Sequence, residues 1–143
     1  MKTGELIRRY RKMRKMTQAD LADACGLSDS AIRNYELGNR MPGSAQLEKI
    51  AAGLGIAPAA LYDIEEESVR DALELLFRME DSYGLHPVAD SDGILLALDP
   101  MAPHAPKLFQ AIEAWEKSRK SLDAGEMSQD EYALWKASFG REE

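Results

Sequence analysis

Cysteine, histidine and long apolar segments are scarce in this sequence of 143 residues. A single cysteine, Cys25, cannot form a disulfide within the chain, which fits a reducing compartment such as the cytoplasm. No apolar run approaches the roughly 18 residues of a membrane-spanning helix. The charged start at Lys2 does not resemble a signal peptide. We therefore expect a cytoplasmic protein with no membrane segment.

Motifs that carry catalysis or bind metals are also missing. The two histidines, His86 and His104, have no second histidine or cysteine at ligand spacing. Three aspartates between residues 90 and 99 lack the twelve-residue pattern of a calcium loop. The sequence has no nucleophile elbow and no glycine-rich phosphate loop. Cys25 precedes a turn glycine, where a small buried side chain is wanted, with a reactive thiol as the alternative. We expect no enzyme, no cofactor and no metal.

Charge is distributed unevenly along the chain. The formal net charge is −7, but residues 1–62 carry 10 Lys and Arg against 6 Asp and Glu, whereas residues 63–143 carry 8 against 19. Attraction to a polyanion acts over about a Debye length, so the local charge matters more than the total. The asymmetry predicts two domains, 1–62 and 63–143, of which only the first is expected to contact nucleic acid.

The segment 17–36, TQADLADACGLSDSAIRNYE, has the pattern of two short helices joined by a tight turn. Thr17 and Asp20 form a predicted capping box at the start of the first helix. Gly26 supplies the left-handed conformation that ends a helix, and Ser28 is a good N-cap for the second. Gly38 closes that second helix. This is the pattern of a helix-turn-helix, whose second helix fits the major groove of DNA.

The rest of the N-terminal region is predicted to be helical as well. Apolar residues recur at helical spacing in residues 5–16 and again in residues 44–54. Pro58 suits the first turn of a last short helix that carries Leu61. Together with the helix-turn-helix, these segments predict a compact domain of five helices.

Residues spread over this region match the sequence pattern of a known protein family. They are 17–22 (TQADLA), 25–28 (CGLS), Ile32, 35–38 (YELG), Pro42, 47–51 (LEKIA), Leu54, Ile56 and Leu61. Residues from about Gly4 to Leu61 thus resemble the phage-repressor-like helix-turn-helix family of transcriptional regulators, also called Cro/C1-type or XRE-type. The resemblance covers 58 of the 143 residues.

The resemblance implies roles for individual residues. Arg11 in the first helix and Glu36 near the end of the recognition helix, about 28–37, are expected to form a structural ion pair. Arg33 and Asn34 have donors and acceptors suited to bidentate contacts with guanine and adenine. The full set of expected DNA-binding residues is Gln18, Ser28, Asp29, Ser30, Arg33, Asn34, Asn39 and Arg40. Asp29 departs from the uncharged residues common at its place, and its alternative role is only to start the helix.

The acidic C-terminal region is predicted to be a small α+β domain. It should contain a helix at 65–81, a β-hairpin with strands near 85–89 and 94–98, and two helices at 106–122 and from Ser128 onwards. Trp115 is expected to face inward. The whole chain is therefore predicted to be mainly α, with the C-terminal domain responsible for dimerisation or regulation.

These features predict a DNA-binding transcriptional regulator, a repressor, that binds a palindromic operator as a homodimer. One alternative is an antitoxin or interaction adaptor whose acidic half binds a partner protein, with DNA binding autoregulatory. Another is a sensor whose hairpin domain binds a small effector. The expected partners are double-stranded DNA and a second copy, with a protein or an effector at the C-terminal domain left open.

Overall fold

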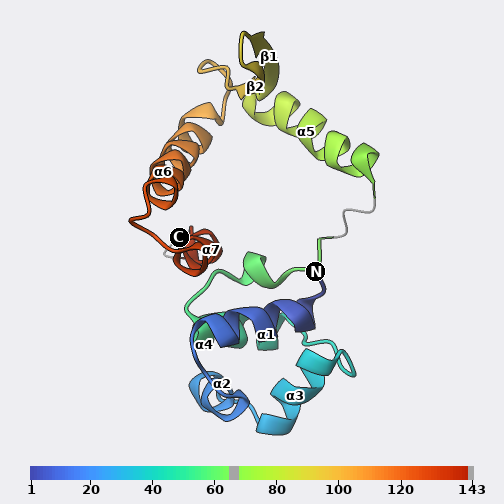
Figure 1. Cartoon of the computed structure of the whole chain (residues 1–143). Helices are drawn as coiled ribbons and strands as arrows, with labels where there is room; N and C mark the ends of the chain where they lie inside the picture. Colours follow the sequence, from blue (N-terminus) through green and yellow to red (C-terminus); the bar gives the residue numbers. More distant parts are fainter. Residues whose placement is uncertain (65–67, 142–143) are drawn as a thin grey trace. The chain divides into compact units, whose positions relative to one another are not determined.

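The structure, a computed structural model, describes residues 1–64 and 68–141. It is mainly helical, with one two-stranded antiparallel sheet, as the sequence predicts (Figure 1). The chain divides into two compact units. The first comprises Met1–Glu65 together with Leu122–Glu143, and the second comprises Glu66–Ser121.

Helices α1 to α4 and a short 3₁₀ helix form the N-terminal bundle of the first unit. Their bounds are α1 Thr3–Met13, α2 Gln18–Cys25, α3 Asp29–Leu37, α4 Ser44–Leu54 and η1 Pro58–Leu61. The five predicted helices are confirmed, the fifth as a single 3₁₀ turn. Helix α1 ends three residues before its predicted end, because Lys15 adopts a positive φ of 57° that no helix continues through.

The capping residues of the helix-turn-helix act as the sequence predicts. The side chain of Thr17 accepts a hydrogen bond from the backbone N–H of Asp20, whose carboxylate accepts one from the N–H of Thr17. Gly26 ends α2 in the left-handed region, with φ of 67°. Ser28 caps α3 by accepting a hydrogen bond from the N–H of Ala31. These local interactions fix where α2 begins and ends and where α3 begins.

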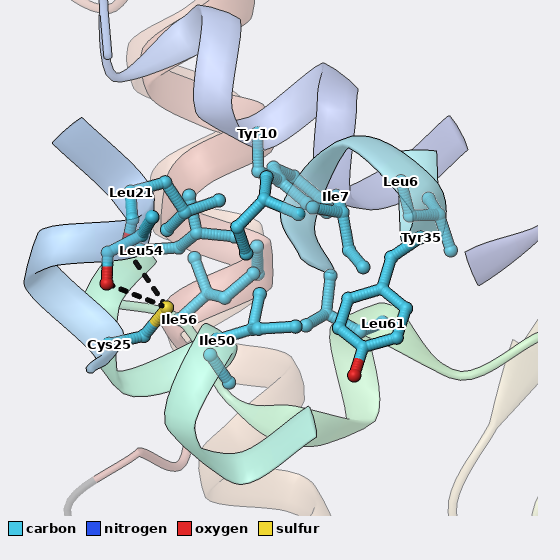
Figure 2. Close-up of a cluster of buried hydrophobic side chains, with 14 residues drawn as sticks. Leu6, Ile7, Tyr10, Leu21, Cys25, Tyr35, Ile50, Leu54, Ile56 and Leu61 are labelled. Carbon is cyan, nitrogen blue, oxygen red and sulfur yellow. Dashed lines mark hydrogen bonds between the residues drawn. The ribbon is translucent and has the colours of Figure 1, made fainter. Parts of the chain in front are cut away.

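One cluster of buried side chains forms the core of this unit (Figure 2). Its members come from every helix of the bundle. The largest fully buried side chains are Ile7, Leu21, Ile32, Ile50, Leu54, Ile56 and Leu61.

The last helix, α7 (Gln129–Ser138), belongs to the first unit. Ala137 is buried in the core cluster, Leu134 packs against the cluster, and the N–H of Ala57 donates to the carbonyl of Ala137 at 2.7 Å. The charge asymmetry of the sequence predicts that residues 63–143 form one C-terminal domain. The structure differs because α7 keeps its acidic residues exposed while its small apolar face completes the core of the N-terminal bundle.

Ala137→Asp is expected to lower the free energy of unfolding by about 2–3 kcal/mol, because it places a carboxylate in an apolar core. The decrease cannot exceed the free energy with which α7 packs on the bundle, because α7 would then detach and expose the carboxylate to water. Gln129→Asp adds the same carboxylate at an exposed position of the same helix and should change stability little. Urea denaturation of both variants measures the difference. Equal, small effects would mean that α7 does not pack on the bundle.

The second unit contains a helix, a β-hairpin and most of a second helix. These are α5 (Val69–Tyr83), β1 (His86–Asp90), β2 (Gly93–Ala97) and α6 (Ala105–Asp123). The hairpin agrees with the prediction to within one residue at each strand end, with His86 opposite Ala97 and Asp90 opposite Gly93. Residues 65–67, at the expected start of α5, lie outside the described residues. In the described part of the chain, no helix is long and apolar enough to cross a membrane.

Apolar side chains of the second unit are largely exposed. Helix α5 has no buried residue although its apolar residues recur at helical spacing. Trp115, expected to face inward, is 51% exposed. Only Leu85, Ala105 and Ser118 are buried among the described residues of this unit. The unit therefore has little core of its own.

Candidate nucleic-acid interface

Helix α3 has one buried and one exposed face. Ile32 and Tyr35 are in the core cluster, with exposed fractions of 0% and 4%. Asp29, Ser30 and Arg33 are exposed. The helical period separates the two sets, so packing of Ile32 and Tyr35 orients the polar residues outward. The exposed face offers a carboxylate, a hydroxyl and a guanidinium to a ligand.

A bidentate ion pair holds α3 against α1. Arg11 Nε donates to Glu36 Oε1 at 2.6 Å and Arg11 Nη2 donates to Glu36 Oε2 at 3.0 Å. Arg11 Nη1 also donates to the carbonyl of Met16 at 2.8 Å. The side chains of Arg11 and Glu36 are 11% and 4% exposed. Arg11 is thus engaged within the protein, as the residue that positions α3.

The ion pair shifts the protonation of both partners. The hydrogen bond to Glu36 raises the pKa of Arg11. Burial acts to raise the pKa of Glu36, but the hydrogen bonds from Arg11 and Gln18, with the positive charges of Arg11 and Arg8, outweigh it and hold that pKa below its ordinary value. Glu36 therefore stays ionised and the pair stays charged at neutral pH.

Gln18 joins this network at the first position of α2. Its amide Nε2 donates to Glu36 Oε2 at 3.0 Å, and its side chain is half-buried. Gln18 also lines a hollow together with both members of the ion pair and with Arg8, Arg33 and Leu37. The structure thus gives Gln18 a positioning contact that the expected role at DNA did not include.

Arg8 belongs to the basic run of the first helix, in which the sequence left a phosphate contact and a solvated position equally open, and it was not among the expected DNA-binding residues. It lines the same hollow as Arg33, although it is on α1 rather than on the helix-turn-helix. Arg8 is three residues before Arg11, so both lie on one face of α1. This spacing is the feature of the sequence from which the position of Arg8 beside α3 could have been predicted. Two guanidinium groups, of Arg8 and Arg33, therefore border one concave surface beside α3, which suits an anionic ligand.

The other expected DNA-binding residues lie at the two ends of α3. At its start, the Ser28 hydroxyl caps the helix and is 3.3 Å from the Ser30 hydroxyl. At its end, Asn39 Nδ2 is 3.5 Å from Asn34 Oδ1. The Arg40 guanidinium is 5.8 Å from the centre of the Tyr35 ring, a cation–π distance. Arg40 is thereby oriented next to the C-terminal end of α3.

Arg14 makes hydrogen bonds within the protein. Its Nε donates to the carbonyl of Leu54 at 2.8 Å and its Nη2 donates to the carbonyl of Gly55 at 3.2 Å. These are carbonyls at the C-terminal end of α4, where a positive charge suits the helix dipole. Arg14 therefore joins α1 to α4.

The charge of the first unit is not basic as a whole. With residues 122–143 included, it has 12 Lys and Arg against 14 Asp and Glu. The basic N-terminal segment keeps its excess of positive charge, and residues 122–143 add mostly acidic ones. Any attraction to phosphate therefore depends on the local position of Arg8, Arg33 and Arg40 rather than on net charge.

The thiol of Cys25 is a core group. It donates to the carbonyl of Leu21 at 2.9 Å, and burial raises its pKa (Figure 2). Its reactivity is therefore low. Among residues 1–64 and 68–141, no group of three or more His, Cys, Asp or Glu is placed to hold a metal ion.

Comparisons with known proteins agree with this geometry. Residues 7–61 match a protein family described as "Helix-turn-helix". The chain is 31% identical over 122 residues to the immunity repressor protein of Bacillus phage phi105, covering 79% of this chain and 83% of that protein. It is 39% identical to the uncharacterized HTH-type transcriptional regulator YazB of Bacillus subtilis, covering 44% of this chain and 91% of YazB.

The chain is also similar to a solved structure, that of the restriction-modification controller protein C.AhdI from Aeromonas hydrophila. It is 30% identical and covers 42% of this chain and 91% of that one, with a TM-score of 0.41. The relatives are regulators of transcription, which confirms that this chain is not an enzyme. The chain belongs to the Cro/C1-type (XRE) helix-turn-helix family of DNA-binding transcriptional regulators and repressors.

Proposed function

We propose that this protein is a cytoplasmic repressor that binds a palindromic operator as a homodimer, with α3 of each copy in the major groove. A two-fold dimer presents two copies of α3 to two half-sites, so the symmetry of the protein is matched by that of the DNA. The observation that carries this proposal is the exposed polar face of α3, held by the Arg11–Glu36–Gln18 network beside Arg8 and Arg33.

In this proposal the residues divide between base and phosphate contacts. Arg33 and Asn34 contact bases, because their side chains allow bidentate hydrogen bonds to guanine and adenine. Asp29 either accepts a hydrogen bond from a cytosine amino group or serves only to start α3. Phosphate contacts fix the register without selecting sequence. The proposed DNA-binding set is Gln18, Ser28, Asp29, Ser30, Arg33, Asn34, Asn39 and Arg40, with Arg8 as an added phosphate contact.

Arg33→Ala and Arg40→Ala are expected to weaken DNA binding in different ways. Arg33→Ala should lower the preference for the operator over random DNA by about 1–3 kcal/mol, because it removes a base contact. Arg40→Ala should weaken binding to both DNAs alike and reduce the salt slope by about 1, because it removes one phosphate contact. Fluorescence anisotropy with both DNAs at several salt concentrations measures the two quantities.

Lys107→Ala is the matched control, since it removes the same charge from an exposed position of the second unit. It should leave both quantities unchanged. If Arg33→Ala and Arg40→Ala produce the same loss on operator and random DNA, the assignment of Arg33 to bases is wrong.

A second function is favoured by the exposed apolar side chains of the second unit. Val69, Leu75 and Phe77 on α5 are 79%, 57% and 50% exposed. An antitoxin or adaptor would cover them with a different protein, with DNA binding autoregulatory. Purification of the chain with its chromosomal neighbours distinguishes the two: a stoichiometric second protein favours the adaptor, and a homodimer favours the repressor.

A further inference from the structure

The second strand of the hairpin is apolar on both faces, and both faces are exposed. Ile94 and Leu96 point to one face and are 77% and 55% exposed, and Leu95 points to the other and is 51% exposed. A strand that is apolar on both sides is typical of the interior of a sheet, with strands on both edges and cover on both faces. A two-stranded hairpin by itself is at most marginally stable in water. Strand β2 therefore has the sequence of a central strand but the position of an edge strand.

The two edges of the hairpin are not equivalent. In an antiparallel ladder, pairs that exchange two hydrogen bonds alternate with pairs that exchange none. Pro87 has no N–H to exchange, so its pair with Leu96 is of the second kind. It follows that the backbone groups of Ile94 and Leu96 point away from β1, to the outer edge of β2. The matching outer edge of β1 lacks a donor at Pro87 and is a poor template for a further strand.

The outer edge of β2 carries unpaired backbone groups. The sheet has only the strands β1 and β2 among the residues that the structure describes, so Ile94 and Leu96 have no ladder partner on that side. The strand from Gly93 to Ala97 carries no charge, unlike typical edge strands that are protected by Lys or Glu. The outer edge of β2 is thus open, uncharged and apolar.

We propose that this edge pairs with the same edge of a second copy, giving a four-stranded antiparallel sheet in the order β1–β2–β2–β1. The proposal rests on the homodimer of the proposed function and names its interface. Leu95 lies on the two-fold axis opposite Leu95 of the second copy. Ile94 of each copy then pairs with Leu96 of the other, and their outward N–H and C=O groups form four hydrogen bonds.

A second copy fits this edge better than any unlike strand for two reasons. Because Pro87 removes a hydrogen-bond donor from the outer edge of β1, each hairpin has one edge that can pair with another strand. When two such edges pair, the sheet ends with four strands and cannot be extended by further copies. In the register centred on Leu95, Asp92 lies opposite Leu98 and not opposite another carboxylate. The acidic turn and the apolar strand are therefore compatible with self-pairing, although the unit is acidic as a whole.

The hairpin is connected to helices that carry exposed apolar residues of their own. The N–H of Asp99 donates to the carbonyl of Gly84 at 3.1 Å. Leu85, which links the end of α5 to the start of β1, is buried. A strand pair alone is smaller than the roughly 800 Å² per partner of a stable interface. Leu73, Leu75 and Phe77 of α5 are exposed in the same unit, so apolar area beyond the strand is present.

Cross-linking of the full chain tests the register. In a Cys25→Ala background, Leu95→Cys places two thiols opposite each other across the axis, with Cα atoms about 4.5 Å apart, within the range for a disulfide. Ala89→Cys is the matched control on β1, whose two copies would be separated by three strand spacings, at least about 14 Å. Mild oxidation should give at least about tenfold more covalent dimer from Leu95→Cys than from Ala89→Cys. Equal yields overturn the proposal.

Proline substitutions test the edge independently. Leu96→Pro removes an N–H that points outward, so the hairpin's own ladder keeps its hydrogen bonds while the proposed interface loses two. Ala89→Pro does the same to the outer edge of β1. Sedimentation equilibrium should show at least about tenfold weaker dimerisation for Leu96→Pro and no change for Ala89→Pro. Equal dimerisation by both variants, with circular dichroism unchanged, contradicts the pairing of β2 edges.

The same samples separate this inference from the proposed function. A chain that dimerises and binds a palindromic site, but shows no selective cross-link at position 95, refutes the hairpin interface and leaves the repressor intact. A chain that cross-links at position 95 but binds no DNA selectively supports the interface and refutes the repressor. Co-purification of a different protein that blocks the cross-link would show that this protein occupies the outer edge of β2, and it would overturn self-pairing.

Discussion

Glu36→Ala is expected to lower the free energy of unfolding by about 3–5 kcal/mol, because it leaves Arg11 buried without its partner. The Glu36 carboxylate accepts hydrogen bonds from both Arg11 and Gln18, and the Arg11 side chain is only 11% exposed. The Arg11 contact to the carbonyl of Met16 cannot neutralise the charge. Urea denaturation at pH 7 measures the change, with Glu48→Ala as the control at an exposed acidic position of the same unit.

The same residue predicts an acid dependence of stability. The pKa of Glu36 in the folded protein is below its value in the unfolded chain, about 4.3. Its contribution is therefore complete above that unfolded value and is lost as pH falls through the lower, folded pKa. Glu36→Gln should flatten this part of the profile between pH 7 and pH 3, whereas Glu48→Ala should follow the wild type. A wild-type slope retained in Glu36→Gln would assign the acid sensitivity to other carboxylates.

Gly4→Ala is expected to lower the free energy of unfolding by about 3 kcal/mol, because a Cβ at this position would overlap the backbone carbonyl of Tyr35. The start of α1 lies directly against the end of α3, and neither backbone can give way as a flexible side chain could. Separating the two helices would also strain the adjacent Arg11–Glu36 pair. Thermal unfolding and operator binding should both be affected, since the recognition helix would shift.

Gly53→Ala in α4 is the matched control for this substitution. A Cβ there would lie 3.2 Å from the Cβ of Cys25, so the neighbour must move by only a few tenths of an ångström. Alanine also has a higher helix propensity than glycine, by about 1 kcal/mol. Gly53→Ala should therefore be nearly neutral. A Gly4→Ala variant as stable as Gly53→Ala would show that α1 and α3 are less closely packed than the structure has them.

The helix-turn-helix was predictable because its signals are local. Thr17, Asp20 and Ser28 cap helices through residues three positions away, and glycine marks the ends of α2 and α3. The hairpin was predictable for the same reason, since the Asp92–Gly93 turn sets the register of its two strands. Each of these features depends on a few neighbouring residues.

The docking of α7 could not be predicted in this way. The sequence predicted a helix from Ser128 onwards, and the structure shows a capping box there, but no local signal showed that Ala137 packs against a bundle more than 70 residues earlier in the chain. The charge of the segment favoured the wrong neighbour, because surface charge does not report which core a small apolar face completes. The same limit applies to Gln18, whose hydrogen bond to Glu36 depends on how α2 and α3 meet.

The interpretation of the second unit was limited by a different cause. Periodic apolar residues on α5 and β2 indicate that they are to be buried, but not against which chain. In the structure these residues are exposed, Ile94 at 77% among them. Such a pattern indicates how much apolar surface must be buried against another chain. Which chain buries it is inferred from the geometry of the hairpin, in which Pro87 leaves only the outer edge of β2 open for pairing.

The most direct test of the central claim is selection of genomic fragments by the purified full-length protein, including its own promoter, at several salt concentrations. The repressor proposal predicts a palindromic site whose half-sites lie about one helical turn or a multiple apart, with affinity that falls steeply as salt rises. Arg33→Ala should lose the preference for that site. Weak binding of all fragments alike, unchanged by Arg33→Ala, would contradict sequence recognition by α3.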